Sequence, residues 1–188
     1  MGRPKQLLEW RGQPLARRAA EALVRSRCER VLTVVGAFGE EVSASLAGLP
    51  IDIVPHPEWR GGVGGSIRVG TLAAEAAGDF DAIAVVLVDQ PHVDSALIDA
   101  LLAGVEGDHG LAACSYAGVL GAPAAFGRAH FRSLRELDGD RGAQSILRAN
   151  AEVACSISFP DGVVDINTME GYERLCSSPS PRRAPHGR

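Results

Sequence analysis

The sequence alternates short β-branched runs with segments whose apolar residues recur at helical spacing. The first helical segment covers residues 14–27 and leads into the run Val31–Val35, which Gly36 closes. Further helices are expected near residues 39–47 and 66–77, and further strands at Ile51–Val54 and Ala82–Val88. Strands that alternate with helices are typical of parallel βαβ units. The 188 residues are enough for one such domain with a sizeable core, so the pattern predicts a single α/β domain.

The second half is less regular. Asp94 or Ser95 can cap the next helix, and Leu111–Ser115 has the composition of a short strand. Glycines and a proline at positions 118, 121, 123 and 127 then interrupt the pattern. Beyond them we expect helices near residues 128–136 and 142–149, a strand at Val153–Ile157 and a last helix that starts near Thr168. The domain is therefore predicted to span residues 1–176, and the polar segment 177–188 to be a disordered tail.

Charge and composition narrow the classes of partner. The formal net charge of −4 argues against nucleic acid or an anionic membrane as the general partner and favours a small-molecule ligand. The first 30 residues are nonetheless basic, which fits either a local anion site or a solvated basic helix face. The basic residues there are Arg3, Lys5, Arg11, Arg17, Arg18, Arg25, Arg27 and Arg30, against Glu9, Glu21 and Glu29.

The remaining bulk features indicate a cytoplasmic protein. The four cysteines form no C-x-x-C pair, and no signal peptide implies an oxidising compartment, so we expect reduced, structural thiols. The longest apolar run, Ala82–Val88, is far shorter than the roughly 20 residues of a membrane span.

Asp89 is the strongest single candidate for a site residue. It directly follows the apolar run Ala82–Val88, at the carboxyl edge where open α/β sheets place their ligands. The alternative interpretation is a turn-stabilising Asp before Gln90 and Pro91. His92 is expected on the rim and not as a metal ligand, because no second His or Cys lies at ligand spacing.

A second candidate is the glycine-rich segment 61–66. Its glycines allow the backbone to approach a ligand closely, and Ser66 can cap a helix whose N-terminus then faces an anion such as phosphate. A flexible loop that ends in a helix cap is the structural alternative.

Six stretches match, in order, the motifs of one known family. MGRPKQLL (1–8) matches the end of L-A-A-G-x-S-x-R-M-G-x-P-K, and HPEWRGGVGGSIRVG (56–70) matches N-P-x-W-x-x-G-M-x-S-S-L-x-x-G, with His56 for Asn, Val63 for Met and Gly65 for the first Ser. DQP (89–91), GAP (121–123, for G-H-P), GDRGA (139–143) and DINTMEGY (165–172, for D-I-D/N-T-P-E-D-Y) follow. From residue 1 to about 175 the chain thus resembles the molybdenum-cofactor cytidylyltransferases, a branch of the nucleotidyltransferases.

The resemblance implies a fold and a set of site residues. The fold is a Rossmann-like three-layer sandwich of the nucleotide-diphospho-sugar transferase type, with a mostly parallel sheet that here lacks its first strand. Lys5, Gly2 and Arg3 would hold the triphosphate, and Asp89 and Asn167 would bind Mg²⁺. Gly64 and Ser66 would lie on the pterin phosphate side. Arg141 would neutralise a substrate phosphate, or else pair with Asp138 or Asp140 on the surface.

The implied activity is transfer of a cytidylyl group from CTP to molybdopterin that carries Mo, with release of pyrophosphate. Guanylyl transfer, or transfer to another small acceptor, is the alternative within the class. The alternative from another class is a non-catalytic molybdopterin-binding or chaperone-like relative, because only the end of the nucleotide-loop motif is present. A third hypothesis is that the natural protein begins roughly 15 to 25 residues upstream. The resemblance leaves room for a molybdoenzyme or chaperone as partner.

Overall fold

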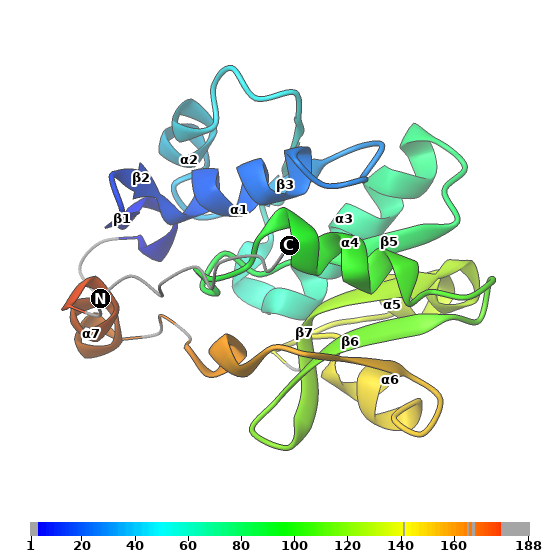
Figure 1. The fold of residues 1–188 in the computed structure, drawn as a ribbon. Helices are drawn as coiled ribbons and strands as arrows, with labels where there is room; N and C mark the ends of the chain where they lie inside the picture. The colour runs from blue at the N-terminus through cyan, green and yellow to red at the C-terminus, as the bar shows by residue number, and fades with distance from the viewer. Residues whose placement is uncertain (1–3, 141, 165, 167, 178–188) are drawn as a thin grey trace.

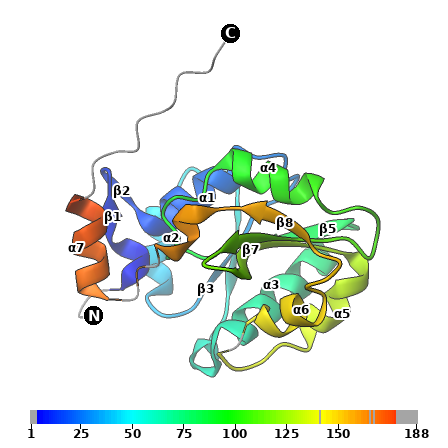
Figure 2. The same ribbon diagram turned by 60° about the horizontal axis from the view of Figure 1, so that its bottom comes forward.

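The chain forms a three-layer α/β/α sandwich, in which helices cover both faces of a central sheet (Figures 1 and 2). The computed structural model describes residues 4–140, 142–164, 166 and 168–177. The helices are α1 (Leu15–Val24), α2 (Gly39–Ser45), α3 (Val63–Ala77), α4 (Ser95–Ala103), α5 (Phe131–Arg135), α6 (Gln144–Ala149) and α7 (Met169–Ser177). The strands are β1 (Glu9–Trp10), β2 (Gln13–Pro14), β3 (Leu32–Val35), β4 (Asp52–Pro55), β5 (Ala82–Val85), β6 (Leu111–Tyr116), β7 (Val119–Gly127) and β8 (Cys155–Ser158).

The main sheet has the strand order β5-β7-β6-β8 and is mixed. Strand β7 runs antiparallel to both β5 and β6, whereas β6 and β8 are parallel. A separate pair, β3 and β4, is parallel, and β1 and β2 form a small antiparallel hairpin. The predicted α/β class and Rossmann-like architecture are confirmed, and the antiparallel β7 is the main difference from the expected parallel pattern.

Strand β7 was not predicted, although it occupies the centre of the sheet. Its glycines and Pro123 break the alternation that marks a strand in sequence. The structure accommodates them at an irregularity of the β6–β7 ladder: Ala113 pairs with Ala124, and the next residue, Cys114, pairs with Gly121. Pro123, which has no N–H to donate, lies in the looped-out stretch between these pairs.

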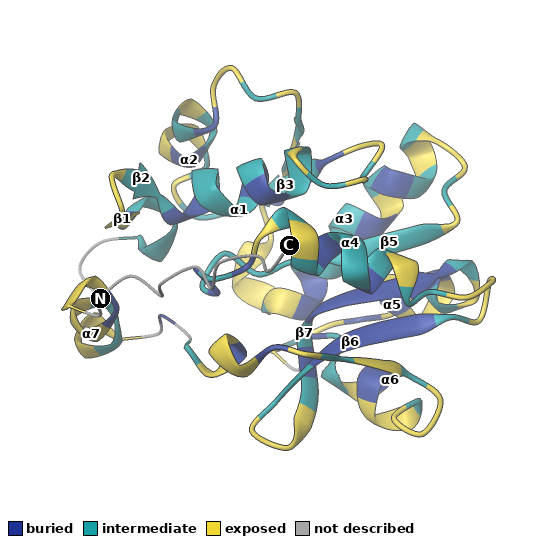
Figure 3. Ribbon diagram, in the orientation of Figure 1, coloured by how far each residue is buried: buried dark blue, intermediate teal, exposed yellow. Residues whose placement is uncertain are grey.

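The two faces of β6 and β7 carry separate halves of the core. Leu111, Ala113 and Phe126 pack on one face against α5 and α6. Ala112, Cys114 and Ala125 lie on the other face, against Ile98 and Leu101 of α4. The alternation follows from the two-residue period of a strand, and it makes this sheet the most deeply buried part of the chain (Figure 3). Burial raises the pKa of the Cys114 thiol to about 12, so this thiol stays protonated and unreactive.

Strands β3 and β5 stand on either side of a large cavity. β3 pairs with β4, and β5 pairs with β7, but within the described residues no strand joins β3 to β5. The cavity between them has a volume of about 1140 Å³, and α1 and α3 also contribute to its walls. Strand β5 is hydrogen-bonded only over Ala82–Val85 and so ends three residues before the expected limit at Val88.

Most of the other predicted elements are confirmed with small shifts of their ends. Asp94 caps α4, since its Oδ1 accepts a hydrogen bond of 2.9 Å from the Leu97 amide. Thr168 caps α7 in the same way, through a 3.1 Å bond from the Gly171 amide. Across the described ranges, no helix combines the length and the apolar character that crossing a membrane requires.

We expect Phe126→Ala to destabilise the protein by about 3–5 kcal/mol, because it removes a fully buried ring that packs between β5, β6 and α5. Val119→Ala at the exposed start of the same strand should cost about 0.5 kcal/mol or less. Urea denaturation of both variants measures the difference. Equal losses of stability would contradict the placement of β7 at the centre of the core.

Candidate functional site

Lys5 and Asp89 meet where β5 gives way to its following loop. The Lys5 Nζ donates a 2.6 Å hydrogen bond to Asp89 Oδ2, and the side chain of Asp89 is only 13% exposed. Lys5 opens a short 3-10 turn whose next residues lead to Leu8, which is buried together with Trp10 and Leu15. The apolar anchor therefore fixes the N-terminal segment and holds the Lys5 ammonium beside the carboxylate.

A third part of the chain reaches the same place from the C-terminal side. The Ile166 amide donates a 3.2 Å hydrogen bond to the backbone carbonyl of Asp89. The Ile166 side chain is fully buried in the cluster that also anchors Leu8 and Trp10. Ile166 is thus held against the loop that follows β5. Asn167, the expected second metal ligand, lies outside the described residues, as do Gly2 and Arg3.

Gln90 connects two further motifs and was not singled out in the sequence. It is 6% exposed, and its Nε2 donates a 2.8 Å hydrogen bond to the carbonyl of Ala122. The bond ties the DQP segment to the GAP segment of β7. The only sequence signal for a buried role of Gln90 is its place in the DQP motif, because an isolated Gln after a strand is usually a solvated turn residue.

The glycine-rich segment is the first turn of α3 and not a loop. Gly62, at φ 102°, is the N-cap, and the helix begins at Val63. The prediction that Ser66 caps this helix is therefore wrong, because Ser66 already lies inside the helix. Gly62 permits the early start, since its positive φ is unfavourable for any residue with a Cβ.

Close packing explains why glycines occupy this turn. A Cβ on Gly64 would lie 2.8 Å from the backbone of Asp138, and a Cβ on Gly62 would lie 2.5 Å from the backbone of Gly139. The Gly64 amide also donates a 2.8 Å hydrogen bond to the Gly139 carbonyl. The GDRGA segment is thereby seated on the N-terminal end of α3. Arg141 itself lies outside the described residues.

His56 occupies the space beside Gly65. Its ring is 4% exposed, and its Nε2 would lie 3.1 Å from a Cβ built on Gly65. The Nε2 has no hydrogen-bond partner within the described part of the chain. The two departures from the family motif, His56 for Asn and Gly65 for Ser, are therefore in contact: the larger ring fills the volume that the serine side chain would need.

The candidate residues do not all face the same space. Lys5, Asp89 and Ser66 line the cavity between β3 and β5, together with Trp59 and Asp140. Gly64 does not line it, because it is buried against the 138–140 segment. The structure thus brings a cation, a carboxylate and a hydroxyl to one cavity and leaves Gly64 as a packing residue behind it.

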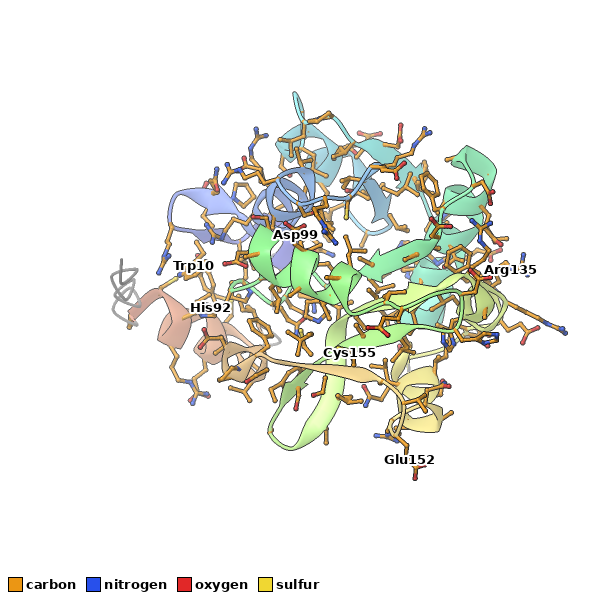
Figure 4. All side chains as sticks on the ribbon, turned by 45° about the vertical axis from the view of Figure 1, so that its right-hand side comes forward. Trp10, His92, Asp99, Arg135, Glu152 and Cys155 are labelled. Atoms are coloured by element: carbon orange, nitrogen blue, oxygen red, sulfur yellow. The ribbon has the colours of Figure 1, made fainter. Side chains whose placement is uncertain are left out.

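A cluster around Trp10 adjoins this region. The guanidinium carbons of Arg11 and Arg18 lie 4.3 Å and 4.4 Å from the centre of the Trp10 ring, and His92 packs edge-on against it at 5.0 Å (Figure 4). Burial lowers the pKa of His92, Asp161 opposes this effect, and the positive charges of Arg11 and Arg18 add to it. His92 is thus part of an aromatic and cationic cluster.

Three further basic residues of the N-terminal region form ion pairs. Arg17 and Arg25 pair with Glu21, and Arg30 pairs with Asp52. For these residues, the pairs favour a solvated basic helix face over a local anion site.

Comparison with known proteins matches the chain to a family. Residues 1–153 match the family described as MobA-like NTP transferase domain. The chain is similar to nicotine blue oxidoreductase of Paenarthrobacter nicotinovorans, with 31% identity over 92% of this chain and 87% of that protein. It is also similar to the purine catabolism protein PucB of Bacillus subtilis, with 27% identity over 93% of this chain and 89% of that protein.

Solved structures of similar proteins have the same fold. The structure of Rv0371c from Mycobacterium tuberculosis in complex with manganese superposes with a TM-score of 0.77 at 26% identity, over 94% of each chain. A nucleotidyl transferase from Methanothermobacter gives a TM-score of 0.75 at 22% identity, over 91% of this chain and 82% of that one, which supports the fold alone.

We expect Gly65→Ser and His56→Asn to be energetically coupled. Serine at position 65 crowds the His56 ring, and asparagine at position 56 relieves the crowding, so the double variant should be about 0.5–2 kcal/mol more stable than the sum of the single effects predicts. Urea denaturation of the four proteins measures the coupling. Gly61→Ser serves as the control, because a Cβ there meets nothing within 4 Å. Strict additivity at position 65 would refute the contact.

We also expect His92 to make the protein less stable as the pH drops. Its pKa is lowered in the folded state, so below about pH 6.5 the unfolded chain binds more protons than the folded one, and the free energy of unfolding decreases. His92→Gln removes this contribution. The wild type should therefore lose stability relative to the variant between about pH 7.5 and about pH 5.5. A constant difference over this range would contradict the shift.

Proposed function

The chain belongs to the family of MobA-like NTP transferase domains, and from this premise we propose that it transfers a cytidylyl group from CTP to Mo-molybdopterin, with release of pyrophosphate. The family makes the protein a nucleotidyltransferase that uses small-molecule nucleotides. The observation that carries the finer proposal is the Lys5–Asp89 pair, since two separate motifs of the cytidylyltransferase resemblance meet at one cavity.

The proposed reaction asks little covalent chemistry of the protein. A terminal phosphate oxygen of the acceptor attacks the α-phosphorus of CTP, and the bond from that phosphorus to the bridging oxygen of the β-phosphate breaks. The leaving group is pyrophosphate, which carries away the bonding electron pair. Because the attacking phosphate is already an anion, no general base is needed, and rate enhancement comes from alignment and neutralisation of charge.

Lys5 and Ser66, which line the same cavity, would provide two of the required contacts. The Lys5 ammonium is a compact point charge that suits triphosphate oxygens. Ser66, in the first turns of α3, offers a hydroxyl near a helix N-terminus, which favours the acceptor phosphate. We assign Gly2 and Arg3 to the nucleotide, Gly64 to the seating of the helix start, and Arg141 to a substrate phosphate.

We propose Mg²⁺ as the metal, held by Asp89 and Asn167. A carboxylate and an amide oxygen are the hard donors that this ion accepts, and it completes its coordination with phosphate oxygens and water. The manganese in the Rv0371c structure supports a divalent metal in this family. When bound, the ion neutralises charge on the phosphate oxygens.

We further propose that residues 1–176 act as one domain in the cytoplasm and that a molybdoenzyme or its chaperone receives the product. The resemblance supports this assignment, and so does the charge of the chain, which does not favour an anionic polymer as partner.

A second candidate is a molybdopterin-binding or chaperone-like protein that does not transfer nucleotides. The two curated relatives bear names from other contexts, one a nicotine blue oxidoreductase and the other a purine catabolism protein. Guanylyl transfer remains the alternative within the transferase class.

We expect pyrophosphate release with CTP and Mo-molybdopterin to exceed that with GTP, and chelation of divalent metal to stop it. A coupled pyrophosphate assay with the four common nucleoside triphosphates measures this preference. Faster turnover with GTP would overturn the cytidylyl assignment, and no turnover with any nucleotide, despite measurable binding of the pterin, would favour the second candidate.

Asp89→Asn should lower kcat/KM about 100-fold or more, because it removes the negative charge proposed to hold the metal. Asp79→Asn is the matched control: this carboxylate is 87% exposed, precedes the same strand, pairs with Arg128 and does not line the cavity, so its loss should leave turnover unchanged. Similar activity in both variants would refute the metal role of Asp89.

A further inference from the structure

Four side chains outside the cavity form a second cationic group, the Trp10 cluster: Trp10, Arg11, Arg18 and His92. The indole ring is its centre, since both guanidinium carbons lie within 4.4 Å of the ring centre and the imidazole meets the ring edge-on (Figure 4). None of the four side chains lines the cavity between β3 and β5. The proposed transfer reaction therefore leaves the Trp10 cluster without a role.

Local structure holds the two arginines beside the ring. Arg11 directly follows Trp10, in the two-residue turn between β1 and β2. Arg18 lies on α1 between two buried residues of the same helix face, because residues three and four apart in a helix are neighbours. Leu15, one turn before it, packs with Trp10, and Ala22, one turn after it, is buried in the core that contains α4. The position of the Arg18 side chain is thus fixed by packing on both sides.

Arg18 has a buried donor that nothing in the described part of the chain satisfies. Its Nε is buried and has no hydrogen-bond partner there. Burial lowers the pKa of Arg18, and the positive charge of Arg11 lowers it further. Glu21 attracts Arg18, but its carboxylate already accepts hydrogen bonds from Arg17 and Arg25. Two neighbouring cations with an unsatisfied buried donor are costly to maintain without an anion.

The chemistry of the Trp10 cluster suits a phosphate group. A guanidinium binds phosphate oxygens through paired N–H donors, and an imidazole can add one further N–H. A phosphate dianion matches the charge of two guanidinium groups, whereas a carboxylate brings a single negative charge. Arg11 is exposed, so an anion can reach the cluster from the solvent.

We propose that the Trp10 cluster is a binding site for a phosphate oxyanion, separate from the cavity between β3 and β5. Arg11 and Arg18 bind its oxygens, and the Nε of Arg18 thereby gains its missing acceptor. His92 borders the site from the loop after β5, three residues beyond Asp89. The bound group is either free inorganic phosphate or a phosphate of a nucleotide, since both present the same oxygens.

The two tryptophans of the chain separate this site from the cavity, because Trp10 belongs to the cluster and Trp59 lines the cavity. Their indole N–H signals, assigned with Trp59→Phe, are followed by NMR of the full chain while inorganic phosphate is added at constant ionic strength. We expect a saturable movement of the Trp10 signal. Arg18→Gln should weaken this binding about tenfold or more, because it removes a charge-assisted hydrogen bond. The absence of a saturable movement in the wild type would overturn the proposal.

Further variants test whether the effect is local. Arg25→Gln is the matched control, since it removes the same charge from the same helix at a side chain that is 71% exposed, and it should change the affinity by less than about twofold. Lys5→Gln, in the cavity, should also leave the Trp10 titration unchanged. Arg11→Gln alters an exposed residue and should weaken binding as Arg18→Gln does. Equal losses in Arg25→Gln and Arg18→Gln would show a general charge effect and refute the site.

Two further titrations identify the anion. Acetate should move the Trp10 signal only weakly, and acetate binding as tight as that of phosphate would refute the phosphate assignment. Metal-free CTP distinguishes the two sources. A CTP-dependent movement of the Trp10 signal that Arg18→Gln abolishes would identify a nucleotide phosphate as the bound group, whereas binding of inorganic phosphate alone would identify the free anion. None of these readouts depends on nucleotidyl transfer.

Discussion

The ion pair between Lys5 and Asp89 is the contact on which the arrangement of the site depends. A partly buried carboxylate is costly to leave without a partner, so the pair favours one position for the N-terminal segment. Next to it, the Asp89 carbonyl accepts the Ile166 amide, and Gln90 binds the carbonyl of Ala122. Four segments that lie far apart in the sequence therefore meet at the end of β5. Each is one of the motifs of the nucleotidyltransferase resemblance.

The N-terminal end of α3 depends on a different constraint, which is close backbone packing. The glycines at positions 62 and 64 let the helix approach the 138–140 segment to distances that no Cβ would tolerate. At Gly65 the same lack of a side chain makes room for His56. The glycine-rich segment that would suit a phosphate-binding loop is, in this protein, a tightly packed first turn, and only Ser66 of the proposed acceptor contacts faces the cavity.

Helices hold the β3–β4 pair and the main sheet together. α1 and α3 span the cavity, and α3 contacts both β3 and β5. Backbone hydrogen bonds, which normally carry a sheet across its centre, stop at β5 on one side and at β3 on the other within the described residues. This explains why β5, an apolar strand, is only half-buried, whereas Leu111–Cys114 of β6 and Pro123–Gly127 of β7 are buried.

The sequence by itself determined the α/β class, the positions of most helices and the presence of a strand shortly before Asp89, because helical periodicity, β-branched runs and caps act over a few neighbouring residues. It also identified Lys5 and Asp89 through ordered motifs. Only the tertiary structure decided that β7 is a central strand, since its Gly and Pro are tolerated at an irregular pairing with β6. The early start of α3, the buried role of Gln90 and the contact of His56 with Gly65 were equally invisible, because each depends on a residue distant in sequence. Local sequence signals determine where helices and strands form, whereas the contacts between these elements are determined by long-range packing.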